Sequence, residues 1–162
     1  MTLQTTLNAI RAHFPCGSGW TKLLAHLGKT KADDDPLEFE TILDSNFEDA
    51  LWCLRALDHT HQRTCRLYAV WCARQVQHLI TDKRSIDALD VAERYANGDA
   101  TDMELDIAWA ASDALAASAA SDSSASWAAA AAASAAASAA GASRDAQIEK
   151  FRQICRAGEW VA

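Results

Sequence analysis

The stretch THQRTCRLYAVWCARQVQHL, from Thr60 to Leu79, decides the fold of this chain. It contains no Gly and no Pro, and apolar side chains cover most of its helical wheel. A helix that is apolar nearly all round is buried among other helices. Its polar exceptions share one stripe: Arg63, Arg66, Arg74 and Gln77. We therefore predict that residues 60–79 form a central helix contacted by other helices on several sides.

Helical spacing and capping signals predict further helices on both sides of this stretch. The predicted helices cover 2–14, 20–27, a short segment after Pro36, a segment starting near Asn46, 85–97, a long tract opened by Thr101 and Glu104, and 147–156. Asn97-Gly98 is a typical left-handed helix stop, and Thr101 with Glu104 matches a capping box. Gly17 to Gly19 is predicted as a turn before the second helix.

The long tract becomes almost pure Ala and Ser after Ala108, with no Lys or Arg before Arg144. One helix from Asp102 to Ser143 would be about 60 Å long at 1.5 Å per residue. We therefore expect a break, either at 121–124 or at Gly141. The uncharged part at 123–143 has the length of a membrane span, but Ala is too weakly apolar and Ser too frequent for insertion.

These patterns predict an all-α protein, a single compact helical domain of six to eight helices with a long Ala-rich C-terminal helix or helix pair. Its 162 residues divide into an N-terminal extension with an acidic loop (1–45), central helices (46–106) and an Ala/Ser-rich tract with a C-terminal helix (107–162). The predicted core is Leu51, Leu54, Leu67, Val70, Trp71, Val76, Leu89 and Trp109.

The sequence offers little for catalysis or metal binding. No G-x-S-x-G, H-E-x-x-H or Gly-rich phosphate loop occurs. His59, His61 and Cys65 are the best metal candidates, but one helix cannot surround an ion that needs four ligands. The five Cys are odd in number and contain no C-x-x-C, which favours buried free thiols. We predict no catalytic residues, no metal and no cofactor.

The arginine stripe has two interpretations. Arg63, Arg66 and Arg74 could hold an anion, or they could pair with acids of a neighbouring helix. We favour the pairs, because an arginine in a buried setting requires partners. The candidate partners are Asp87, Asp90 and Glu93.

An acidic stretch from Asp33 to Asp49 carries eight acids and no Lys or Arg, in a chain of net charge −7. Such a run either solvates a surface or attracts a basic partner. The acidic balance disfavours direct nucleic-acid binding. We predict a protein partner with a basic surface, and the predicted contact set is Asp33, Asp34, Asp35, Glu38 and Glu40. The Ala/Ser tract is the alternative surface, suited to packing within the fold or in a homodimer.

Three segments carry a family resemblance: NFEDALWCLRAL at 46–57, RLYAVWCARQVQHLI at 66–80, and ALDVAERYANGDATDMELDIAWAA at 88–111 with the Ala-rich tract behind it. They resemble a family of immunity proteins from bacterial polymorphic toxin systems. Residues 19–46 resemble the front extension of its phage and prophage relatives. This chain departs from the family by carrying Ser, not Arg, within the Ala tract.

The resemblance implies an all-helical protein that binds and neutralises another protein, and it supplies no catalytic residues. We therefore expect a non-enzymatic inhibitor in the cytoplasm of a bacterial host cell, without membrane insertion. One expectation is an immunity-type protein that neutralises a bacterial effector or toxin. The alternative is a phage anti-defence inhibitor, anti-CRISPR-like, whose acidic surface imitates nucleic acid.

Overall fold

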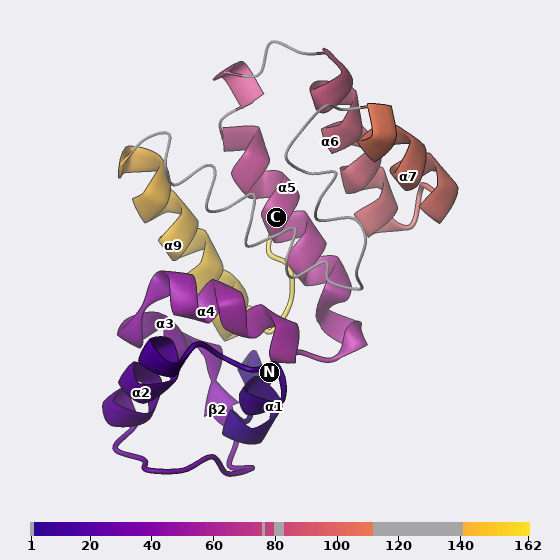
Figure 1. Cartoon of the computed structure of the whole chain (residues 1–162). Helices are drawn as coiled ribbons and strands as arrows, with labels where there is room; N and C mark the ends of the chain where they lie inside the picture. Colours follow the sequence, from indigo (N-terminus) through magenta and orange to yellow (C-terminus); the bar gives the residue numbers. More distant parts are fainter. Residues whose placement is uncertain (1, 76, 80–82, 112–140) are drawn as a thin grey trace.

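A computed structural model describes residues 2–75, 77–79, 83–111 and 141–162 of the chain (Figure 1). Within these ranges the chain is mostly helical, with eight α-helices and one short pair of strands. The all-α prediction is therefore confirmed. The predicted long Ala-rich helix, the position of its break and the homodimer contact fall mainly on 112–140, outside the described residues.

The described residues contain the following elements in chain order. They are β1 (Gln4–Thr5), α1 (Leu7–Ala12), α2 (Gly17–His26), β2 (Leu37–Glu38), α3 (Phe39–Ser45), α4 (Phe47–Cys53), the 3-10 helices η1 (Leu54–Ala56) and η2 (His59–His61), α5 (Gln62–Gln75), the 3-10 helix η3 (Gln77–Leu79), α6 (Lys83–Asn97), α7 (Asp102–Ala111) and α9 (Gly141–Ala157).

The first residues differ from the prediction, which placed them in a helix over 2–14. Residues 4 and 5 instead form β1, which pairs antiparallel with β2. The amide of Leu3 donates to the carbonyl oxygen of Cys155 over 2.7 Å. Helix α1 begins only at Leu7, where the hydroxyl of Thr6 accepts from the amide of Ala9. Pairing with distant backbone thus displaces the first turns of the predicted helix. The predicted turn at 17–19 is likewise the first turn of α2.

Helix α5 is central, as predicted, but it spans only Gln62–Gln75 of the predicted 60–79. The 3-10 helix η2 directly precedes it, and residues 77–79 form the 3-10 helix η3. Helix α5 contacts α6 on one side and α9 on another (Figure 1). Its buried residues are Thr64, Cys65, Leu67, Tyr68, Val70 and Cys72. Among the described elements, helix α5 therefore lies between the α6–α7 pair and helix α9.

The main core forms around Phe151 of α9, which is 1% exposed. Its ring centroid lies 6.4 Å from that of Phe39, 6.3 Å from that of Phe47 and 5.3 Å from that of Tyr68. The hydroxyl of Tyr68 donates to the carbonyl oxygen of Gln147 over 3.1 Å. The C-terminal helix therefore joins α3, α4 and α5 into one core.

The predicted core is confirmed in part. Leu51, Leu54, Leu67 and Val70 are buried. Trp71 and Leu89 are only half-buried. Trp71 stacks on Tyr68, and the ammonium of Lys150 lies 5.8 Å from its ring centre, so a charged side chain covers part of it. Val76 and the side chain of Trp109 lie outside what the structure describes.

The N-terminal segment supplies core residues that are absent from the predicted core set of eight. Leu3, Leu7, Ile10, Phe39 and Ile42 are buried in the same cluster as Phe151. The described part of the predicted N-terminal extension thus shares one hydrophobic core with the C-terminal helix.

Local signals at helix ends are confirmed. The side chain of Asn46 caps α4 by accepting from the amide of Asp49 over 2.9 Å. Thr101 and Glu104 form a reciprocal capping box at the start of α7. Gly98 ends α6 with a φ of 83°, a left-handed conformation that glycine adopts without a steric penalty.

Replacing Phe151 by Ala should lower the free energy of unfolding by about 3–5 kcal/mol, because it leaves a cavity among three aromatic rings. Trp71→Ala should cost less, because Trp71 is only half-buried. Urea denaturation followed by circular dichroism measures both. If Phe151→Ala lowered the free energy of unfolding no more than Trp71→Ala does, the central role of Phe151 in the core would be contradicted.

Candidate functional site

The predicted acidic stretch is distributed over the loop after α2, strand β2 and helices α3 and α4. The structure divides its side chains into two groups. Some carboxylates bind cations of the same chain, and others face solvent. This division decides which of the five predicted contact residues can meet a partner.

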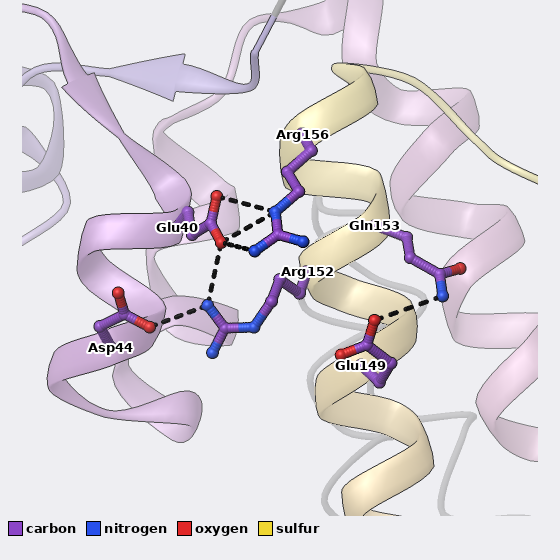
Figure 2. A network of polar contacts seen from close by, with 6 residues as sticks. All are labelled: Glu40, Asp44, Glu149, Arg152, Gln153 and Arg156. Atoms are coloured by element: carbon purple, nitrogen blue, oxygen red, sulfur yellow. Dashed lines mark hydrogen bonds and ion pairs between the residues drawn. The ribbon is translucent and has the colours of Figure 1, made fainter.

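Glu40 belongs to the first group, at the centre of a network between α3 and α9 (Figure 2). Its carboxylate accepts from Arg156 over 2.6 Å and from Arg152 over 3.0 Å. Arg152 also reaches Asp44, one turn further along α3, over 2.9 Å. Hydrogen bonds from Arg156 and then Arg152 lower the pKa of the Glu40 carboxyl. Glu40 therefore attaches the C-terminal helix to α3.

Asp33 and Asp35 share a second cation, Lys29, at the end of α2. The Lys29 ammonium lies 2.6 Å from Asp33 and 2.9 Å from Asp35. The hydrogen bond between Lys29 and Asp33 lowers the pKa of the Asp33 carboxyl and raises the pKa of the Lys29 ammonium. The amide of Asn8 donates to the carbonyl oxygen of Asp33 over 3.0 Å. The loop that carries these acids is therefore held against α1 and α2.

Three of the five predicted contact residues present carboxylates to solvent. Asp34 and Glu38 are exposed, and the side chain of Asp35 is 76% exposed despite its contact with Lys29. Glu38 accepts a hydrogen bond from the hydroxyl of Thr2. We name Asp34, Asp35 and Glu38 the acidic edge. Asp33 and Glu40 are half-buried and bind cations within the chain.

Only one arginine of the α5 stripe pairs with acids as predicted. Arg74 bridges Asp90 and Glu93 of α6 over 2.6 and 2.8 Å. Arg63 instead donates to the amide oxygen of Asn97. The guanidinium of Arg66 lies 4.6 Å from the ring centre of Tyr95. The stripe therefore joins α5 to α6. Asp87, the third predicted partner, is bound by Lys83.

The histidines considered as metal ligands lie in η2, where Asp58 caps the turn. Cys65 lies buried in α5. Within the described ranges, no three or more His, Cys, Asp or Glu side chains are placed to hold a metal ion. In the same ranges, none of the helices combines the length and apolar character needed to cross a membrane.

The thiols form two classes. Cys53, Cys65, Cys72 and Cys155 are buried, and burial raises the pKa of each to about 12. Cys16 is exposed and caps α2, where its sulfur accepts from the amide of Gly19 over 3.4 Å. This hydrogen bond and one with the Ser18 hydroxyl lower the pKa of Cys16.

Sequence reasoning missed two exposed apolar residues on α7. Met103 is 71% exposed and Ile107 is 63% exposed. The available signal was their spacing of four residues, which places both on one side of a helix, beside the acids Asp102 and Asp106.

Comparisons of the chain with models of known protein families, with curated protein sequences and with solved structures found no match.

The ion pairs of Glu40 predict an acid-sensitive contribution to stability. The pKa of Glu40 in the folded protein lies below its usual value of 4.5. Its contribution is therefore complete above pH 4.5 and is lost as the pH falls through the folded pKa. Urea denaturation of the wild type and Glu40→Gln should show a stability difference at pH 7 that shrinks at pH 3. Glu38→Gln is the control, and an equal effect from it would contradict the role of Glu40.

Thiol reactivity should separate the two classes of cysteine. In the native protein, a disulfide-exchange reagent such as Ellman's reagent should label Cys16 rapidly and the four buried thiols slowly, because only thiolates attack. In urea, all five should react. Cys16→Ser should remove the rapid phase, and a rapid phase that persists in this variant would contradict the assignment.

Proposed function

We propose that this chain is a non-enzymatic protein-binding inhibitor of the immunity type, which neutralises a bacterial effector or toxin through the partner's basic surface. One observation carries the proposal. The acidic edge, Asp34, Asp35 and Glu38, stands exposed on a loop and strand that the rest of the fold holds in place. The resemblance to immunity proteins agrees with this function.

Anchoring matters because binding costs less when the contacting groups are already ordered. The loop is tied by Lys29 to Asp33 and by the amide of Asn8. Strand β2, which carries Glu38, pairs with β1. The exposed carboxylates are thus preorganised. Fixed charges of one sign also accelerate the encounter with a surface of opposite sign.

The proposed contact set is narrower than the one expected from sequence. Glu40 and Asp33 are half-buried and bind cations of this chain, so a partner would have to displace Arg152, Arg156 or Lys29 to reach them. Asp35 also contacts Lys29, but its side chain is 76% exposed and stays accessible. Neutralising Glu40 would therefore perturb folding as well as binding. A clean test changes only the acidic edge.

The test uses a triple variant, Asp34→Asn, Asp35→Asn and Glu38→Gln. Affinity purification from the bacterial host with the wild-type chain identifies the partner, and its association rate is then measured with purified proteins. At low salt the triple variant should associate roughly tenfold more slowly, because electrostatic steering is weakened. The difference should shrink near physiological salt, where the screening length is about 8 Å.

The matched control removes the same charge elsewhere, with Asp145→Asn, Glu149→Gln and Glu159→Gln, which are all exposed. Its association rate should stay close to that of the wild type. Equal slowing by both variants would reduce the effect to net charge and contradict a defined contact surface. Purification of a toxin would favour immunity, and purification of a host defence complex would favour the anti-defence role.

A further inference from the structure

Helix α7 has one packed side and one open side. It lies against α6 (Figure 1). Leu105 is buried, whereas Met103 and Ile107, one turn apart, are 71% and 63% exposed. Ala110 continues the same side and is also exposed. Single exposed apolar residues are ordinary on protein surfaces, but these three follow the i, i+4, i+7 spacing by which a helix docks into a partner.

The charged residues of helix α7 itself are all acidic, although one of them is paired with an arginine of α6. Helix α7 contains Asp102, Glu104 and Asp106 and no Lys or Arg. Glu104 is paired with Arg94, and Asp102 accepts from the hydroxyl of Tyr95. Asp106 is exposed and has no ion-pair partner among the described residues. An apolar stripe bordered by acids complements an apolar stripe bordered by bases.

We propose that the α7 face, formed by Met103, Ile107, Ala110 and Asp106, binds a basic amphipathic helix of a partner protein. Apolar side chains of that helix would contact Met103 and Ile107, and its Lys or Arg residues would face Asp106. Methionine suits such a contact because its flexible thioether adapts to differently shaped partners.

The acids of the α7 face favour a basic protein segment over two other possible partners, a second copy of this chain and an anionic lipid surface. A second copy docked through the same face would bring its own acids against Asp102 and Asp106, which is unfavourable. An anionic lipid surface would meet the same repulsion. A basic protein segment gains from both the apolar and the charged contacts.

This inference goes beyond the proposed function and does not depend on it. The acidic edge lies on β2 and the loop after α2, whereas α7 lies at the far end of the molecule (Figure 1). The two surfaces can therefore be altered separately, and either can fail without the other.

The test uses a labelled synthetic helix of about 18 residues, or five turns, with Leu at i, i+4 and i+7 and Lys on both flanks. A second peptide carries Glu in place of Lys. Fluorescence anisotropy should show binding of the basic peptide and not of the acidic one. The double variant Met103→Gln and Ile107→Gln should raise Kd roughly tenfold, as expected for loss of apolar anchors.

Controls keep the result specific. Asp106→Lys should also weaken binding, whereas Phe14→Gln, which changes an apolar residue that is 90% exposed elsewhere, should leave it unchanged. The triple variant of the acidic edge should bind the basic peptide with unchanged affinity. Circular dichroism melting curves establish that the variants are folded. Equal weakening by the acidic-edge variant would reduce the interaction to general charge attraction and overturn the proposal.

A second measurement tests whether the face is free in the isolated protein. Met103 should be oxidised by hydrogen peroxide nearly as fast in the native protein as in urea, as followed by mass spectrometry. Protection that depends on protein concentration would show that a second copy occupies the face. Protection that is independent of protein concentration would show that another part of this chain covers the α7 face. Either kind of protection would overturn the proposal.

Discussion

The contact of Phe151 with three aromatic rings is the constraint on which the described fold depends. Its neighbours Phe39, Phe47 and Tyr68 come from α3, α4 and α5, so one side chain of the last helix connects three earlier elements. Near it, the amide of Leu3 donates to the carbonyl oxygen of Cys155, and the amide of Phe39 donates to the carbonyl oxygen of Leu3. The core is thus completed only when the end of the chain returns to its beginning.

Ion pairs at the edge of this core also connect α9 to α3. Arg152 and Arg156 lie one turn apart on α9, and both reach Glu40 on α3. Partly exposed ion pairs contribute modestly to stability, but the shared carboxylate of Glu40 constrains how α3 and α9 align. The acidic composition therefore serves two purposes. Part of it holds helices together, and the acidic edge is exposed to solvent.

The acidic edge and the α7 face differ in composition. The acidic edge is polar and suited to attracting a basic partner over a distance, so its effect depends on salt. The α7 face combines apolar side chains with acids, and burial of its apolar part is insensitive to screening. Binding at the acidic edge should depend on salt concentration more strongly than apolar contact at the α7 face. The two surfaces also lie at different ends of the molecule, so experiments can distinguish their roles.

The sequence alone determined what depends on near neighbours: the helical class, the buried character of α5, the cap at Asn46, the box of Thr101 and Glu104, and the stop at Gly98. These features arise from interactions within a few residues, which a sequence displays directly. Tertiary structure alone decided the pairing of β1 with β2 and the binding of Glu40 by Arg152, which is 112 residues away. It also decided which acids face solvent, because any of several arginines could have neutralised them and only packing selects the pair.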